Sequence, residues 1–186
     1  MINNKETSVL KMVQLAMLTA IVVVLQCLSI PLGATAINLA LLPVVIGASI
    51  CGIWAGAWLG LVSGVTILVS QQAAFFFTMS PFATIVVVLL KGCASGVAAG
   101  FVYSLLEKKN KYLAVVIAGL TAPVVNTAIF LIGCLTLFYA DFAVYGNVFV
   151  YVVTTFVAIN FPIEIGMNML FSPVIVRIVD IVKKKL

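Results

Sequence analysis

The chain has 186 residues, of which 65% are hydrophobic and only 8% are charged, and it contains no histidine. No charged residue occurs between Lys11 and Lys91, and so long an uncharged stretch cannot form the surface of a protein dissolved in water. A water-soluble fold is therefore excluded. Since about 20 helical residues cross a bilayer core roughly 30 Å thick, residues 1–186 are expected to form one all-α membrane domain, a bundle of six transmembrane helices.

The first half of the chain predicts three of these helices. A first span covers residues 8–29 and ends before a Pro-Leu-Gly sequence, in which both proline and glycine break helices. A loop over residues 33–38 follows. Two shorter helices, at residues 39–50 and 52–70, are then expected to form a hairpin.

The second half predicts three longer spans. Ser80 is the expected N-cap of a fourth span over residues 81–106, which has proline at its first position and ends before a lysine-rich segment. A fifth span is expected at residues 112–139. A sixth is expected to run from Asn147 to an amphipathic end at residues 173–186.

The basic residues indicate how these spans cross the membrane. If the spans alternate, both termini lie on one side together with nine of the ten basic residues, namely Lys5, Lys11, Lys108, Lys109, Lys111, Arg177, Lys183, Lys184 and Lys185. Cytoplasmic segments carry the excess of lysine and arginine, so a multi-pass protein of the cell membrane with cytoplasmic termini is expected. Residues 33–38, 71–79 and 140–146 then lie outside. This clustering also argues against a nucleic-acid partner despite the net charge of +5.

The lack of histidine excludes Ser-His-Asp chemistry and the histidine-containing zinc motifs, and no enzymatic activity, metal or cofactor is expected. Four cysteines lie singly in apolar runs, as small buried hydrophobic residues do: Cys27, Cys51, Cys93 and Cys134. Two alternatives stay open. One is a membrane electron-transfer subunit in which cysteines from different helices hold an iron–sulfur centre, and the other is a membrane assembly or scaffold protein.

Small residues recur at a spacing of four, which builds smooth helix faces that pack closely in lipid. The clearest series are Gly52, Gly56, Gly60 and Gly64 in the third span and Gly92, Gly96 and Gly100 in the fourth. Both predict packing inside the bundle. Ala16 and Ala20 form a weaker pair in the first span, compatible with internal packing or with contact to a partner's helix.

Two charged residues, Lys91 and Glu164, are expected inside the membrane, where a charge must face the protein interior. Lys91 lies near mid-depth and Glu164 nearer the cytoplasmic half. Two interpretations apply to this pair: a structural salt bridge, or a ligand-binding role for at least Lys91.

Polar neighbours favour a ligand site. Thr84 and Ser95 share a helix face with Lys91, and Asn160 and Asn168 repeat with Glu164 at every fourth residue. Prolines in the last two spans remove amide donors near these positions, and broken helices with polar groups at mid-depth are typical of solute sites. The expected binding residues are Asn38, Gln72, Lys91, Asn126, Tyr151, Asn160 and Glu164.

Six short spans in under 200 residues, the Ala16-x-x-x-Ala20 pair, an outer loop after it and a lysine-rich cytoplasmic loop together resemble a known family. The chain is similar to the substrate-binding S components of energy-coupling-factor (ECF) vitamin transporters. Residues 80–92 and 123–127 resemble the pantothenate-type branch. Ser80 and Val88 depart from it, because asparagine and a basic residue are expected there.

The resemblance implies a high-affinity vitamin binder, embedded in the lipid bilayer, whose pocket lies near the outer face. It also implies partners that supply energy: a transmembrane coupling (T) subunit and two ATP-hydrolysing subunits. The chain itself has no GxxxxGK[ST] phosphate loop, as expected if the partner subunits hydrolyse the ATP. Ala16 and Ala20 are then expected on the docking face for the coupling subunit.

Overall fold

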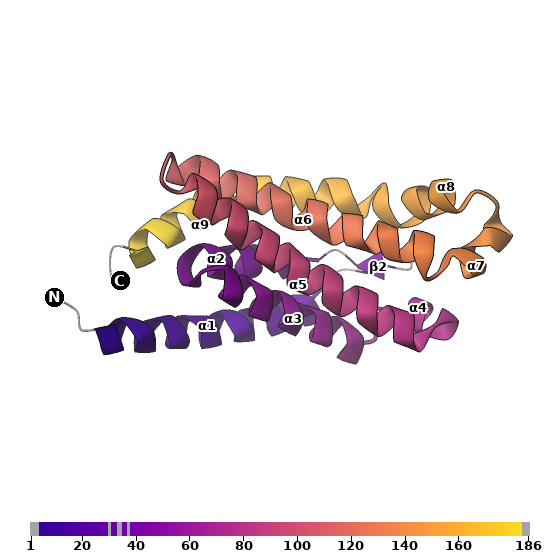
Figure 1. Cartoon of the computed structure of the whole chain (residues 1–186), viewed down its shortest axis with the longest axis horizontal. Coiled ribbons are helices and arrows are strands. Elements are labelled where there is room, and N and C mark those ends of the chain that lie inside the picture. The colour runs from indigo at the N-terminus through magenta and orange to yellow at the C-terminus, as the bar shows by residue number, and fades with distance from the viewer. Residues whose placement is uncertain (1–3, 30, 33–34, 37, 184–186) are drawn as a thin grey trace.

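The computed structural model describes residues 4–29, 31–32, 35–36 and 38–183, which form an elongated bundle with its helices along the long axis (Figure 1). The first helix, α1, begins at the same end of the bundle at which the last helix, α9, ends. The short helices α4, α7 and α8 lie at the opposite end. Lys184 and Lys185, two of the basic residues used for the expected topology, lie outside the described residues.

The first half of the chain contains α1 (Asn4–Cys27), a ribbon of two short strands, β1 (Pro31–Leu32) and β2 (Thr35–Ala36), and then α2 (Leu41–Cys51) and α3 (Ile53–Val69). The strands pair antiparallel, with Pro31 opposite Ala36. Gly52 separates α2 from α3 with a φ of 98°, a conformation that glycine adopts without a steric cost. The expected pair of short helices is therefore confirmed.

Three helices follow: α4 (Ala74–Met79), α5 (Pro81–Leu106) and α6 (Lys111–Thr136). The predicted start of α5 is confirmed, because the Ser80 hydroxyl accepts a hydrogen bond from the Ala83 amide. Asn110 caps α6 in the same way. The outer segment expected as a loop at residues 71–79 contains the one-and-a-half-turn helix α4 instead.

The last part of the chain contains α7 (Tyr139–Phe142), a 3₁₀ turn (Ala143–Tyr145), α8 (Val148–Val152), a π-helical turn (Val153–Val157) and α9 (Asn160–Lys183). The span expected from Asn147 is divided between α8 and α9. Pro162 has no amide hydrogen to donate to the carbonyl of Ala158, and the helix is interrupted there. The Ala158 amide bonds five residues back to Val153, at 2.8 Å, which closes the π-helical turn.

Four helical segments are long and apolar enough to cross a bilayer: residues 9–27 of α1, and α5, α6 and α9. The bent segment of residues 139–157, with an angle of 90° at its break, adds a fifth candidate. At 11 and 17 residues, α2 and α3 are shorter than the roughly 20 residues of an independent span. The structure thus describes a helical, multi-pass membrane protein, whereas a count of six spans stays a prediction.

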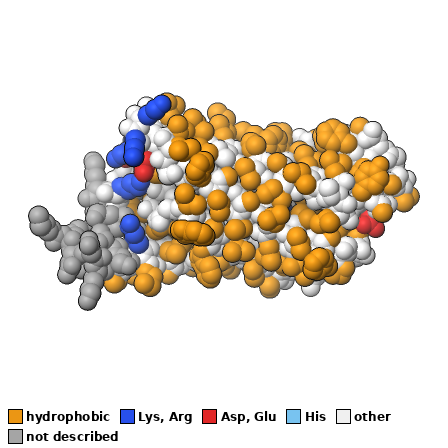
Figure 2. All heavy atoms as spheres, viewed as in Figure 1, with side chains coloured by type: hydrophobic (Ala, Val, Ile, Leu, Met, Phe, Trp, Pro, Cys, Tyr) orange, Lys and Arg blue, Asp and Glu red, His pale blue; other side chains and the backbone are white. Residues whose placement is uncertain are grey.

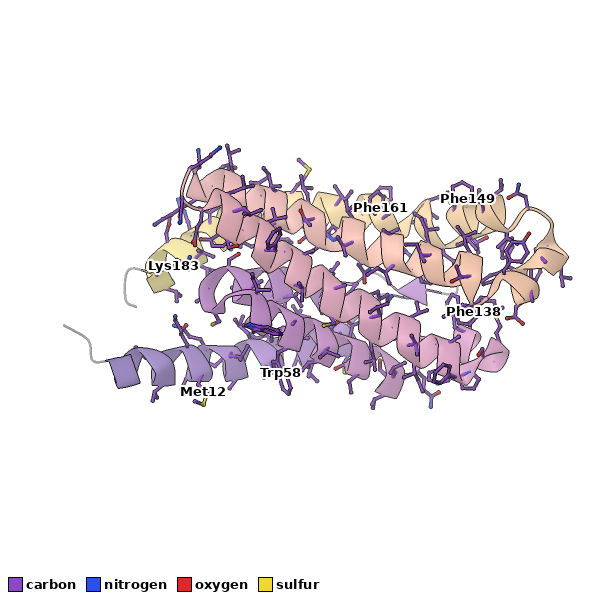
Figure 3. All side chains as sticks on the ribbon, in the orientation of Figure 1. Met12, Trp58, Phe138, Phe149, Phe161 and Lys183 are labelled. Carbon is purple, nitrogen blue, oxygen red and sulfur yellow. The ribbon has the colours of Figure 1, made fainter. Side chains whose placement is uncertain are left out.

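The exterior of the bundle matches a lipid environment. Apolar side chains cover its length, and lysine and arginine gather at the end where α1 begins (Figure 2). Met12 and Trp58 on the α1–α3 side and Phe149 on the α8 side point outward, and each is more than half exposed (Figure 3). A surface of this kind is stable against acyl chains and not against water.

The closest packing in the bundle joins α3 to α5 through their glycine series. A Cβ atom on Gly60 would collide with the carbonyl oxygen of Gly92, and one on Gly92 would collide with that of Gly60. The same reciprocal approach joins Gly56 to Gly96. The prediction of packing inside the bundle is therefore confirmed for these four glycines, whereas Gly52, the first of the predicted series, is exposed and meets no atom within 4 Å of an added Cβ. Only glycine allows the two backbones to approach this closely.

We expect Gly60→Ala to destabilise the protein by about 1–3 kcal/mol, since the added methyl group must push the α3 and α5 backbones apart. The matched control is Gly166→Ala, because an added Cβ on this α9 glycine meets no atom within 4 Å. The control should be neutral or stabilising by up to about 1 kcal/mol, the usual helical preference for alanine. Thermal unfolding in detergent micelles measures both, and equal effects would contradict the assigned packing.

Candidate functional site

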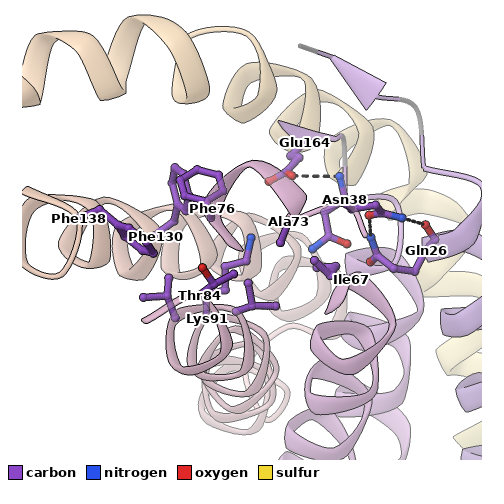
Figure 4. Close-up of a pocket in the computed structure, with 13 residues that line it drawn as sticks. Gln26, Asn38, Ile67, Ala73, Phe76, Thr84, Lys91, Phe130, Phe138 and Glu164 are labelled. Carbon is purple, nitrogen blue, oxygen red and sulfur yellow. Dashed lines mark hydrogen bonds between the residues drawn. The ribbon is translucent and has the colours of Figure 1, made fainter. Parts of the chain in front are cut away.

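A cavity of about 70 Å³ lies inside the bundle, between α5, α6 and α9 and beneath the segments that connect α1–α2 and α3–α4 (Figure 4). One wall is aromatic and is formed by Phe76, Phe130 and Phe138. Polar side chains from five segments complete the lining: Gln26, Asn38, Gln72, Thr84, Lys91 and Glu164. An apolar wall with a few convergent polar groups is the usual composition of a small-molecule site.

A second cavity, of about 50 Å³, adjoins the first. Lys91, Phe130 and Glu164 line both cavities and form the boundary between them. The second cavity adds Asn126 of α6 and Asn160 at the start of α9. Its wall also includes Phe156 and Val157 of the π-helical turn, so the irregular backbone lies beside the site.

Lys91 supplies the positive charge of this site. Its ammonium nitrogen lies 5.5 Å from the centre of the Phe130 ring, a cation–π distance. Within the described part of the chain, it has no hydrogen bond, and no carboxylate oxygen lies within the 4.0 Å of an ion pair. Glu164 lines the same two cavities, and its carboxylate interacts with the Lys91 ammonium electrostatically without direct contact. The direct salt bridge that the sequence left open is therefore not formed between these two residues.

Glu164 has a different partner. Its side chain is buried, and one carboxylate oxygen accepts a hydrogen bond of 3.1 Å from the backbone amide of Asn38 (Figure 4). This bond joins the segment after β2 to the start of α9. The carboxylate thus fixes one edge of the cavity, while the ammonium of Lys91 faces its interior.

Two carboxamide oxygens at the site lack partners among the described residues. They belong to Asn38 in the first cavity and Asn126 in the second, and both side chains are buried. Asn160 differs, because its Nδ2 donates to the carbonyl of Phe156 at 3.1 Å. Buried polar atoms are normally paired, and a ligand with N–H or O–H groups would pair these two oxygens.

Sequence reasoning missed Gln26, which is almost fully buried in α1. Its side-chain nitrogen donates to the Gln72 side-chain oxygen at 2.7 Å, and Gln72 donates back to the Gln26 carbonyl at 2.6 Å. The Ser63 hydroxyl also donates to Gln26, at 2.8 Å. These bonds tie α1 to α3 and to the segment before α4. The signal in the sequence was a carboxamide near the end of an otherwise apolar span.

The structure brings six of the seven expected binding residues to the two cavities: Asn38, Gln72, Lys91, Asn126, Asn160 and Glu164. The seventh, Tyr151, lies outside both linings. Its ring stacks on Tyr145, with centroids 4.5 Å apart and planes inclined by 6°, at the end of the bundle near α7. Ser95, expected on the polar face of α5, donates instead to the Gly92 carbonyl.

The small residues of α1 lie away from the cavities. Ala16 and Ala20 are both exposed on the outside of the bundle. Their neighbours on this side, Met12 and Met17, are more than 60% exposed. Internal packing therefore does not account for the alanine pair.

Apolar helices that enclose an aromatic cavity with one ammonium group and unpaired carboxamide oxygens are the features expected of a membrane protein with a small-molecule site. A sequence profile described as "ECF transporter, substrate-specific component" matches residues 10–176. The chain belongs to this family, whose members are the substrate-binding subunits of transporters. A comparison with curated proteins gave no significant match.

Membership in the family has two general implications. The family implies a small-molecule substrate, and it implies a transmembrane T partner and ATP-hydrolysing partners. It lends no support to the electron-transfer and scaffold alternatives.

Proposed function

We propose that this chain captures a small carboxylate-bearing micronutrient, of pantothenate-like chemistry, for ATP-driven import by its partners. The observation that carries the proposal is the ammonium of Lys91, which faces the cavity without an ion-pair partner among the described residues. An unpaired charge in a low-dielectric interior is costly, and a ligand carboxylate offsets that cost.

The rest of the lining fits such a ligand. The unpaired oxygens of Asn38 and Asn126 accept hydrogen bonds from hydroxyl and amide groups, which a pantothenate-like molecule carries beside its carboxylate. The phenylalanine wall covers its aliphatic part. We place the carboxylate at Lys91, where the two cavities meet, so that the remainder of the ligand extends into both.

Val88 narrows the choice of ligand. In the pantothenate-type branch a basic residue is expected at this position, but here a buried valine lines the first cavity. Lys91 is then the one cation among the described lining residues. This composition favours a ligand with a single carboxylate over one with two.

We further propose that the cavities open toward the outside of the cell and that both termini are cytoplasmic. The described lysine and arginine side chains other than Lys91 gather at the end where α1 begins and α9 ends, away from α4 and α7 (Figures 1 and 2). The rule that cytoplasmic segments carry the positive charges then orients the bundle.

The proposed partner contact is the outer side of α1. Ala16 and Ala20 are small, exposed and one helical turn apart, which allows a helix of the coupling subunit to approach closely. The cavity residue Gln26 projects from the same helix more than one turn further on, so this contact leaves the binding site uncovered.

Lys91→Met should weaken binding of radiolabelled pantothenate roughly tenfold to a hundredfold, the usual loss for a charge-assisted hydrogen bond. Glu164→Gln retains an oxygen for the Asn38 amide and serves as the matched control. If Lys91 contacts the ligand, the double variant binds as weakly as Lys91→Met. Full recovery of pantothenate binding in the double variant would show that Lys91 only balances the charge of Glu164. Absence of pantothenate binding by the wild-type protein would contradict the proposed ligand class.

The orientation is tested with single cysteines in a background from which the four native cysteines are removed. Val144, which is 85% exposed, marks the end near α7, and exposed Lys109 marks the opposite end. A membrane-impermeant maleimide added to intact cells should label residue 144 and should reach residue 109 only after the cells are opened. The reverse pattern would invert the proposed topology.

The double change Ala16→Trp with Ala20→Trp should leave pantothenate affinity within about twofold, because neither residue lines a cavity. It should abolish co-purification of the coupling subunit, since bulky side chains prevent close helix contact. The control pair, Leu170→Trp with Val174→Trp, has the same spacing on the exposed side of α9. Retained co-purification with the α1 pair, or equal loss with the α9 pair, would overturn the assigned docking surface.

A further inference from the structure

A third cavity, of about 200 Å³, lies at the opposite end of the molecule from α4 and α7. It is formed by the first part of α1, the turn between α2 and α3, and the ends of α5 and α9. None of its lining residues belongs to the two cavities already described. The proposed transport function therefore leaves it unexplained.

A buried tyrosine lines this cavity. Tyr103 of α5 is only 2% exposed, and its ring lies under the Lys183 ammonium, 4.5 Å from the ring centre. No described residue meets both the distance and the angle of a hydrogen bond to this hydroxyl, although the side chains of Lys183 and Glu107 lie close enough to interact with it. A buried hydroxyl without a partner is costly, and an acceptor in the cavity would satisfy it.

The start of α3 presents amide donors at the same place. Gly52, its N-cap, has no side chain to accept a bond from the first-turn amides, and that turn contains no acidic residue. Gly52 and Ile53 both line the cavity. The free amides of a 17-residue helix and its dipole favour an anion at this position.

The charges at the cavity leave a positive surplus. Lys11, Lys183 and Glu107 line it, and Lys183 forms an ion pair with Glu107. Lys11 has no carboxylate partner among the described residues. One unpaired lysine and the positive end of α3 match an anion of a single negative charge, despite the neighbouring Glu107 carboxylate.

We propose that this cavity binds the phosphodiester of an anionic phospholipid, with Tyr103 donating to a phosphate oxygen and Lys11 balancing its charge. The setting favours a lipid over free phosphate. Trp54, in the first turn of α3, is 87% exposed, and tryptophans of this kind occupy the boundary between membrane and water. Met12, beside Lys11 on α1, is 65% exposed and offers an apolar surface for an acyl chain.

The test uses the full-length protein in neutral maltoside micelles with equal amounts of phosphatidylglycerol and phosphatidylcholine. Native mass spectrometry counts the lipids that each protein molecule retains. Wild type should retain one phosphatidylglycerol in preference to phosphatidylcholine. Equal retention of the two lipids would indicate non-specific annular lipid and would overturn the site.

Two variants separate a built site from general surface charge. Tyr103→Phe keeps the buried ring and should weaken retention of phosphatidylglycerol roughly tenfold. Lys11→Gln should weaken it about fivefold, as expected for one lysine near an anionic headgroup. The control is Lys109→Gln, an exposed lysine at the same end that does not line the cavity. A loss with the control equal to that with Lys11→Gln would overturn the proposal.

Two further outcomes are decisive. If the unpaired Tyr103 hydroxyl has no ligand, Tyr103→Phe will not reduce retention of phosphatidylglycerol, and its Tm without lipid will stay the same or rise. In a separate arm, inorganic phosphate replaces the lipid, and the Tm of wild type is measured. A Tm increase with inorganic phosphate that matches the increase with phosphatidylglycerol would overturn the lipid assignment.

Discussion

The absence of water from the bilayer core is the constraint on which the rest of this structure depends. Every backbone amide and carbonyl there must find a partner within the protein, and helices achieve this without help from neighbouring segments. Side chains face the same requirement. Thr19, Ser49, Thr66 and Thr84 each donate a hydrogen bond to a carbonyl four residues earlier in their own helix. Lys91, Asn38 and Asn126 are among the groups that such local bonds leave unsatisfied, and these three share one region of the bundle.

The backbone becomes irregular beside the second cavity. Pro162 and the π-helical turn interrupt the last long helical segment at residues 158–159, which are themselves exposed. Phe156, Val157 and Asn160 beside this interruption line the second cavity. An irregular backbone at membrane depth is therefore used to shape a cavity, whereas Pro123, which lies within α6, leaves that helix continuous.

Local chemistry made parts of this structure predictable. The start of α5 depends on two consecutive residues, Ser80 and Pro81, and the glycine series depend on a spacing within single helices. Four of the expected binding residues, Lys91, Asn126, Asn160 and Glu164, reach the cavities because polar residues in long apolar spans have few other places to go. Asn38 and Gln72 reach them from connecting segments. Tyr151 could not be placed from sequence, since an aromatic ring is equally stable in the cluster with Tyr145. The bond between Asn38 and Glu164 joins residues far apart in the chain and leaves no local pattern.

The arrangement of α1 links the two surfaces proposed to act in transport. The remainder of the core is held by the close backbone contact of α3 with α5, which a side chain larger than hydrogen would disrupt. In contrast, α1 is largely exposed, and near the cavity its polar attachment consists of the Gln26 bonds to Ser63 and Gln72. Ala16 and Ala20 lie on the same helix, on its exposed side. Since a helix is stiff, a displacement of α1 at the alanine pair also displaces Gln26. The hydrogen bonds between Gln26 and Gln72 then either resist this displacement or move Gln72, which lines one edge of the cavity, together with α1.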